Sequence, residues 1–292
     1  MPTSIIGEGF KILYASMAAA EDLYLYHLCP GGAVLRLVIP GSPWRCRVCR
    51  WSSIVDADPL EQRVLTEREL AARLPLLSPE ILLLDGPEPL AQLRDKGLGL
   101  PTLAMKSWRS VKYVAFSTMG FISREVIEEA YAAGFRAVVF EYTPPYEIPP
   151  GFDRVVERLR RIYDVFPILE IITYYDGDKR AKTTISSLAA EYPEAALHIV
   201  ALNGASDAAY SLAEKLREKH LNVYPHPEES YTLLNTTCTS CGRVLVERRP
   251  WGVKVNVKGE GLVVCPYCGA QQRLIVCNTR RVRSMHREVI VW

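Results

Sequence analysis

Three pairs of cysteines in this 292-residue chain have the spacing of metal-binding loops. Six of the eight cysteines fall in C-x-x-C pairs, and the other two, Cys29 and Cys277, stand alone. Two thiolates at this spacing can share a metal ion or form a redox pair, and in a reducing cytosol metal is the commoner use. A lone cysteine is more often a small buried hydrophobe. The pairs therefore indicate metal chemistry in two parts of the chain.

The stronger motif lies near the C-terminus. Two C-x-x-C-G sequences, with 23 residues between Cys241 and Cys265, supply Cys238, Cys241, Cys265 and Cys268. Four thiolates suit a tetrahedral zinc ion, and a site filled by four cysteines has no open position for catalysis. A rubredoxin-type iron site uses the same ligands, so the choice of metal stays open. We predict a structural zinc ribbon over residues 232–276.

The N-terminal pair, Cys46 and Cys49, follows the apolar segment 33–39, which predicts a buried strand. Ser42 stands four residues before Cys46, so the loop has the layout of an iron–sulfur motif with serine at its first position. A serine alkoxide is a much poorer iron ligand than a thiolate at neutral pH. The pair can thus hold half of a metal site.

Strands and helices alternate through the first 228 residues. Further apolar strands are predicted at 81–85, 111–117, 136–141, 167–173, 197–202 and 221–224, with helices between most of them. This alternation is typical of right-handed βαβ units and a parallel sheet. We predict an α/β fold: a full or partial (β/α) barrel over residues 1–228, the ribbon, and a basic tail over 277–292.

Motifs at the ends of three successive strands resemble those of radical SAM enzymes. Cys46 and Cys49 match the last two cysteines of that family's C-x-x-x-C-x-x-C motif. Gly-Pro-Glu-Pro at 86–89 stands where the family has Gly-Gly-Glu-Pro, and Thr-Met-Gly at 118–120 where many members have Thr-Asn-Gly. Over roughly residues 13–270 the chain is similar to the radical SAM component of the AmmeMemoRadiSam system, which is related to pyruvate formate-lyase-activating enzymes.

The resemblance implies a radical SAM barrel and roles for individual residues. Cys46 and Cys49 would bind a 4Fe-4S cluster, with Ser42 at the third ligand position. Reductive cleavage of S-adenosylmethionine would then give a radical that acts on an unknown protein or small-molecule substrate. The positions that the resemblance assigns to S-adenosylmethionine are Gly86, Pro87, Glu88, Thr118, Gly120 and His198. A histidine within an apolar strand, such as His198, can equally be a satisfied core residue.

Five departures from the family pattern fall at the predicted functional rim. Besides Ser42, they are Arg50-Trp51 in place of Gln-Asn, Pro87 in place of a glycine, and changed motifs at 140–142 and 174–177. Two hypotheses stay open. One is a radical SAM protein that binds cluster and S-adenosylmethionine, and the other is a degenerate scaffold that acts as a zinc-containing binding or interaction protein. A zinc site or redox pair at Cys46 and Cys49 is a third, weaker reading.

Further cysteines, acidic residues and histidines are expected at this rim or away from it. Cys277 is the only candidate for a third thiolate, because Cys29 precedes the first strand and should lie at its opposite end. Tyr174, Glu141 and Glu170 are expected at the carboxyl ends of strands, where barrel sites are built. His27, His220 and His226 are expected at edges or on the surface.

Composition limits the setting and the partners. No run of about 18 apolar residues and no leader-like N-terminus occurs, which predicts a cytoplasmic protein without a membrane span. Five asparagines, four glutamines and 20 prolines favour a thermophilic source. The net charge of +2 says little about partners, and we interpret the basic stretch 279–287 as a solvated face. A protein partner is therefore expected before a nucleic acid.

Overall fold

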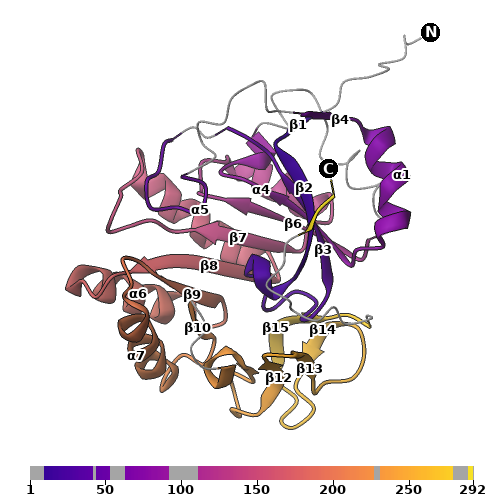
Figure 1. Ribbon diagram of the computed structural model, residues 1–292. Coiled ribbons are helices and arrows are strands. Elements are labelled where there is room, and N and C mark those ends of the chain that lie inside the picture. The colour runs from indigo at the N-terminus through magenta and orange to yellow at the C-terminus, as the bar shows by residue number, and fades with distance from the viewer. Residues whose placement is uncertain are drawn as a thin grey trace.

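A nine-stranded, mostly parallel sheet organises the molecule (Figure 1). The computed structural model describes residues 10–41, 44–52, 63–91, 111–226, 231–278 and 289–291. Ser42, the linker residues 227–230 and the basic stretch 279–287 lie outside the described residues. The parallel strands follow chain order across the sheet: β3 (Ala33–Val38), β5 (Ile81–Asp85), β6 (Tyr113–Thr118), β7 (Ala137–Glu141), β8 (Ile168–Tyr175), β9 (Ala196–Ala201) and β10 (Val223–His226).

The other edge of the sheet is antiparallel. There β2 (Tyr14–Ala19) pairs with β3, and β16 (Val289–Ile290) pairs with β2. A separate two-stranded sheet joins β1 (Phe10–Ile12) to β4 (Arg63–Leu65). The edge strands β10 and β16 have no pairing with each other among the described residues. The predicted α/β fold and parallel order are therefore confirmed, while the sheet is open over the described part of the chain.

Five described helices connect the strands and cover one face of the sheet (Figure 1). Their apolar sides join the outward-facing residues of the sheet in one large buried cluster. Side-chain caps define three of their starts: Thr66 forms a capping box with Glu69, and Ser123 and Asp178 accept hydrogen bonds from the first turns. The helices are α1 (Glu67–Leu77), α4 (Arg124–Ala132), α5 (Phe152–Val165), α6 (Lys179–Glu191) and α7 (Ser206–Arg217).

The inner face of the sheet is covered by the chain itself. Small side chains such as Ala115 and Ala137 face inward, and Leu25 and Leu28 pack over them from the segment that follows β2. That segment includes the short helix η1 (Glu21–Leu23). Because alternate strand residues point to this face, a charged residue in an apolar strand is carried into the interior, and Arg36 on β3 is one example.

The cysteine-rich module packs beneath the sheet (Figure 1, orange to yellow). It has a small core of its own, and its strand β15 also meets the first domain through a bridge between Leu28 and Ile275. Its elements are η3 (Tyr231–Leu234), β11 (Thr236–Thr237), β12 (Val244–Arg249), β13 (Gly252–Val255), β14 (Gly261–Val264) and β15 (Gln271–Val276). Across the described chain, no helix is both long and apolar enough to cross a bilayer.

Candidate functional site

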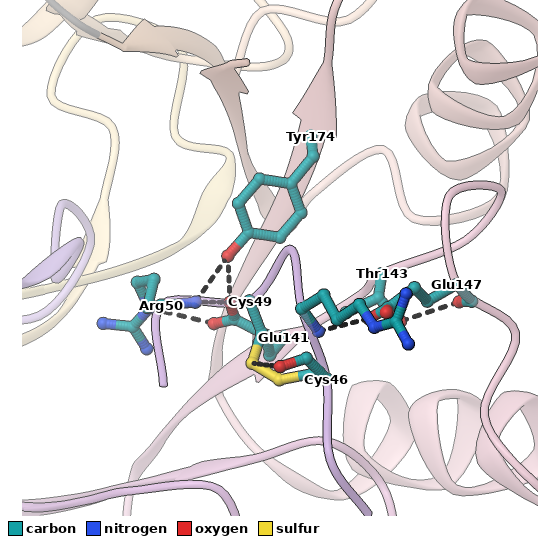
Figure 2. Close-up of a disulfide and its surroundings, with 8 residues drawn as sticks. Cys46, Cys49, Arg50, Glu141, Thr143, Glu147 and Tyr174 are labelled. Carbon is teal, nitrogen blue, oxygen red and sulfur yellow. Dashed lines mark hydrogen bonds and ion pairs between the residues drawn. A yellow bond between two sulfur atoms is a disulfide. The ribbon is translucent and has the colours of Figure 1, made fainter. Parts of the chain in front are cut away.

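The loop that carries Cys46 and Cys49 lies at the carboxyl end of β3. The two cysteines are joined as a disulfide, with their Cα atoms 5.7 Å apart (Figure 2). Both are buried in an aromatic and thioether cluster with Trp51 and Met119. Met119 follows β6, and its amide donates to the carbonyl of Pro87 at 3.2 Å. The loops after β3, β5 and β6 therefore meet at one edge of the sheet.

Two glutamates anchor this loop through backbone amides (Figure 2). The amide of Arg47 donates to Glu147 Oε2 at 2.7 Å. The amide of Arg50 donates to Glu141 Oε1 at 2.9 Å and to the hydroxyl of Tyr174 at 3.0 Å. Glu141 ends β7 and Tyr174 lies near the end of β8, so the loop is tied to the inner edge of both strands.

Arg50 forms the centre of a buried ionic network. Its Nε lies 2.9 Å from Glu141 Oε2, and its Nη2 lies 3.8 Å from Asp85 Oδ1. Arg36 completes the network with a 2.6 Å contact to Asp85 Oδ2. Neither Asp85 nor Glu141 exposes any side-chain surface, so two guanidinium groups neutralise two carboxylates away from water.

Burial and these charges determine how the network ionises. Burial disfavours the charged form of Arg50, but Glu141 and then Asp85 outweigh it and raise the pKa of Arg50 above its ordinary value. Burial, and next the charge of Glu141, raises the pKa of Tyr174 well above its usual range. Tyr174 therefore stays a neutral phenol, and its hydroxyl donates a hydrogen bond to Glu141 Oε1.

Trp51 occupies the space between the cysteines and the network. Its side chain is buried, and the guanidinium of Arg50 lies 4.4 Å from the centre of its ring. Arg36 approaches the same ring at 5.6 Å. Cation–π contacts of this kind add to the ion pairs when the groups are withdrawn from water. The side chains of Arg50 and Trp51 therefore fill the inner side of the rim.

The segment after β5 is bound by its own neighbours. Gly86 donates its amide to Ser117 Oγ at 2.9 Å and accepts from the same hydroxyl at 2.6 Å. A Cβ atom at Gly86 would lie 2.3 Å from the carbonyl oxygen of Ile39, and its φ of +140° is unfavourable for other residues, so glycine is required here. Pro87 offers no amide, and its carbonyl is taken by Met119.

Glu88 is a buried carboxylate that holds the loop after β6. Its Oε1 accepts from the amides of Met119 at 2.9 Å and Phe121 at 2.8 Å, and its Oε2 accepts from Thr118 Oγ1 at 2.8 Å. Gly120 in turn donates its amide to Thr118 Oγ1 at 2.9 Å. Burial raises the pKa of Glu88 to about 7, although these hydrogen bonds oppose it. Glu88 therefore positions the loop after β6, and both of its carboxylate oxygens already accept hydrogen bonds from it.

His198 belongs to a second buried network, on β8, β9 and β10. Its Nε2 lies 2.9 Å from Glu170 Oε2, and its Nδ1 lies 3.0 Å from His226 Nε2. Glu170 also accepts from the amide of His27 at 2.7 Å. Burial raises the pKa of Glu170 to about 8 and lowers that of His198 well below its usual value. Both aromatic contacts and hydrogen bonds mark His198 as a satisfied core residue.

Three placements expected from the sequence are wrong. His27 and His226 are buried rather than on the surface, although His226 lies on the edge strand β10, because both side chains are drawn into this second network. Glu170 lies deep within β8 and not at the rim, because the strand continues to Tyr175 and carries the chain five residues further. Each residue faces the interior that the chain itself fills.

Arg248 of the cysteine-rich module reaches the second network. Its Nε lies 3.2 Å from Glu21 Oε1, and its Nη2 donates to the carbonyl of Tyr26 at 2.6 Å. The guanidinium also lies 4.1 Å from the centre of the Tyr26 ring. Arg248 is buried, although β12 belongs to the small module. One arginine therefore couples the module to the first domain.

The expectation that Cys29 and Cys277 stand as lone, unbonded cysteines is wrong. Cys277 is bonded to Cys29, with Cα atoms 4.9 Å apart, so it is not a third thiolate beside Cys46. The reason is that β15 pairs with residues 27–29: Cys29 donates its amide to Ile275, and Ile275 donates to His27, both at 2.8 Å. Cys29 packs beside Gly32 and Glu80, near the starts of β3 and β5, which is the end opposite the Cys46 loop.

The four remaining cysteines converge in the small module. Their sulfur atoms all lie within 4.8 Å of one another, with 3.6 Å between Cys238 and Cys268 and 3.8 Å between Cys241 and Cys265. Thiolates around a tetrahedral zinc ion at about 2.3 Å are about 3.8 Å apart. Among the described residues, this is the one group of three or more His, Cys, Asp or Glu side chains arranged to hold a metal.

Comparisons with known proteins give little. No family model matches the chain, and no curated protein matches it. Among solved structures, the crystal structure of methylornithine synthase (PylB) aligns with 56% of this chain and 52% of its own length, at 12% identity and a TM-score of 0.43. The match thus spans about half of that protein. A likeness of this strength carries nothing about activity, so function has to be read from the residues of this chain.

Proposed function

We propose that this chain is a radical SAM-like protein, of the AmmeMemoRadiSam and pyruvate formate-lyase-activating-enzyme type, whose rim no longer supports radical chemistry. It acts instead as a zinc-containing binding protein for a protein partner in the cytoplasm of a thermophile. Support for the scaffold is the chain order of the parallel strands, together with the motifs at 46–49, 86–89 and 118–120 on neighbouring loops.

The observation that carries this proposal is the ion pairing of Arg50, whose side chain is only 13% exposed, and the burial of Trp51, both beside the cysteine pair. Arg50 is bound to Glu141 and Asp85, and Trp51 packs against both cysteines. Removing the Arg50 guanidinium would leave Glu141 in the interior without its cation, at a cost of about 3–5 kcal/mol, while Asp85 would keep its pair with Arg36. The rim is therefore closed by interactions that a ligand would have to break.

The residues of the rim do not fit a 4Fe-4S cluster. Two sulfurs are present, and the described residues bring no third thiolate, imidazole or carboxylate into a ligand set with them. The hydrogen-bonding groups at the place expected for S-adenosylmethionine already have partners. Gly86, Glu88 and Thr118 form hydrogen bonds between the segments after β5 and β6. No chemical step is assigned to either group.

The cysteine-rich module fits zinc well. Four sulfurs at tetrahedral distances, of which Cys241 and Cys268 are exposed and Cys238 and Cys265 buried, would close the coordination sphere and leave no catalytic position. The ion would hold together a module whose own core is small. Within the proposal, this zinc module is the docking element for the partner.

A second function is favoured by one observation. Cys46 and Cys49 do lie beside the Gly86–Glu88 segment, through Met119, as a cluster site would require. If Ser42 or an external ligand completed the set, the chain would be a radical SAM enzyme. The proposal differs from this reading in a measurable way.

The test is S-adenosylmethionine cleavage after anaerobic reconstitution with iron and sulfide. The native chain is compared with a triple variant, Ser42→Cys, Arg50→Gln and Trp51→Asn, which restores the family residues. We expect no 5′-deoxyadenosine from the native chain under a strong reductant. Turnover by the native chain would overturn the proposal and establish the second function. Turnover by the triple variant alone would locate the loss of activity in these three residues.

A further inference from the structure

We infer that Cys46 and Cys49 form a reversible dithiol–disulfide switch, which sets whether Arg50 and Trp51 are held against the sheet. The two cysteines are bonded in the structure, and their Cα separation of 5.7 Å lies within the range of a natural disulfide. The switch rests on the proposed function in one respect, namely that these sulfurs are not occupied as cluster ligands.

The surroundings of the pair favour an uncharged form over a metal-bound one. Trp51, Met119, Trp44 and Phe121 form the wall of this cluster, and burial in such a wall disfavours two thiolates. No third metal ligand joins the pair among the residues that the structure describes. A disulfide and a neutral dithiol are the two states that this environment accepts.

The pair is placed to control the network next to it. Arg50 directly follows Cys49, and its amide bonds to Glu141 and Tyr174. Arg47 lies between the cysteines and bonds to Glu147. With the disulfide closed, residues 46–49 form a ring with few free torsions, and this ring includes Arg47 and ends next to Arg50. Reduction restores torsional freedom to the segment, and the anchors at Arg47 and Arg50 then open more often.

The second disulfide differs in each of these respects. Cys29–Cys277 spans 248 residues and joins two strand-like segments that are hydrogen-bonded to each other. Closing a long loop constrains the unfolded chain strongly, whereas closing a separation of three residues constrains it little. The Cys46–Cys49 bond can therefore open without loss of the fold, and Cys29–Cys277 provides a structural comparison within the same chain.

The Cys46–Cys49 bond is buried, so a reductant reaches it when the loop opens, and the exposed residues that flank Cys46 are charged. Arg45 and Arg47 are exposed on either side of Cys46. These positive charges attract an anionic thiolate to Cys46. The proposed reductant is a dithiol protein: its first thiolate attacks Cys46, Cys49 leaves as a thiolate and takes up a proton, and a mixed disulfide forms. The second thiol of the reductant then displaces Cys46, which is protonated, and the reductant leaves as a disulfide.

The experiment uses the native full chain, purified without reductant, with dithiothreitol as the probe. Samples equilibrated over a range of reduced-to-oxidised dithiothreitol ratios are quenched in acid, alkylated, and mapped by peptide mass spectrometry. We expect both Cys46 and Cys49 to become alkylated at a single midpoint and to revert on reoxidation. Cys29 and Cys277 stay protected until denaturant is added. Cysteines 46 and 49 that are alkylated at every ratio, or that resist reduction in the folded chain, would overturn the inference.

Two readouts test the link to the network. Amide hydrogen exchange at Arg47 and Arg50 should become about tenfold faster on reduction, because the ring no longer restrains their hydrogen bonds. Tryptophan fluorescence should rise on reduction, since a disulfide quenches an adjacent indole, and the rise should be smaller in Trp51→Phe, where Trp44 is the remaining indole of the cluster. If amide exchange and fluorescence are unchanged in a fully reduced chain, the switch is refuted, although the disulfide itself would still be reversible.

Iron analysis of the same samples separates this inference from the proposed function. Iron bound in stoichiometric amount would mean that the proposed function has failed, and the cysteines would be ligands. Free cysteines without iron, at oxidising dithiothreitol ratios, would mean that only the switch has failed. Cys46→Ser with Cys49→Ser serves as the matched control, and it should lose the redox response while it keeps zinc in the module.

Discussion

The guanidinium of Arg50 lies 2.9 Å from the carboxylate of Glu141, and both groups are withdrawn from solvent at the carboxyl ends of the parallel strands. In a parallel α/β sheet this edge is where ligands bind. Here a charge pair from the chain itself occupies the edge, with Asp85 and Arg36 as further members. The chain has therefore placed its own cation at the edge of the sheet where ligands commonly bind.

Replacing Arg50 with alanine should destabilise the fold by about 3–5 kcal/mol, because Glu141 would be left buried without its cation. Urea denaturation of the native chain and the variant measures this change. Arg124→Ala is the matched control: its partner Glu128 is four residues away on an exposed helix surface, and the ion pair is screened by water. Equal effects of the two substitutions would contradict the account of the network.

Glu88 predicts a pH dependence of stability. Its pKa rises from an ordinary 4.5 to about 7 in the folded state, so the folded chain binds the proton more tightly than the unfolded chain. The resulting stabilisation is complete below pH 4.5 and is lost as the pH rises through about 7. Over this range the loss amounts to about 3 kcal/mol.

A Glu88→Gln variant isolates that contribution from the buried histidines. The amide oxygen can keep the bonds from Met119 and Phe121 without carrying a charge. The stability of the variant relative to the native chain should increase as the pH rises from 5 to 8. Urea midpoints measured across that interval report the change. A constant difference between the two proteins would show that Glu88 does not titrate there.

Zinc content tests the cysteine-rich module. The native chain should hold one zinc ion, and Cys241→Ser should lose it, because three thiolates bind zinc much more weakly than four. Elemental analysis after dialysis against a mild chelator provides the measurement. Cys277→Ser is the control and should retain zinc, since Cys277 is bonded to Cys29 rather than to the module's ligands. Zinc retained by Cys241→Ser would contradict the site.

Arg248 and Arg249 are neighbours in sequence, but their substitutions should have a large and a small effect on stability, respectively. Arg248→Ala removes the buried contacts to Glu21 and Tyr26, and it should destabilise the chain by about 3–5 kcal/mol and loosen β12 from the first domain, while the Cys29–Cys277 bond keeps the module attached. Arg249 is half exposed and pairs with Glu247, so its substitution should change little. Limited proteolysis near residues 227–235 reports the loosening, and equal cleavage of both variants would refute the role of Arg248.

The sequence predicted the parallel order because long apolar runs alternate with helix patterns. The strand 81–85 was predicted with the bounds that the structure gives to β5. It did not predict β2, whose Tyr-Ala-Ser-Met-Ala-Ala has a weak pattern, because this strand depends on pairing with β3. Pairing of distant segments is not encoded in local periodicity.

The candidate site was predicted in its position but not in its interactions. The motifs indicated that Cys46, Glu88 and Thr118 would come to neighbouring loops, and they do. Arg36 carried a signal that was missed, since a charged residue within an apolar strand has to find a buried partner. The pairing of Cys29 with Cys277 had no such signal, because it depends on how β15 docks against residues 27–29.

The most direct test of the account is the metal inventory of the chain purified under anaerobic conditions without reconstitution. With the rim closed by Arg50 and Trp51, elemental and sulfide analysis should find about one zinc per chain and no stoichiometric iron or acid-labile sulfide. About four irons and four sulfides per chain would show that a cluster forms beside Cys46 and Cys49, and would contradict the closed rim.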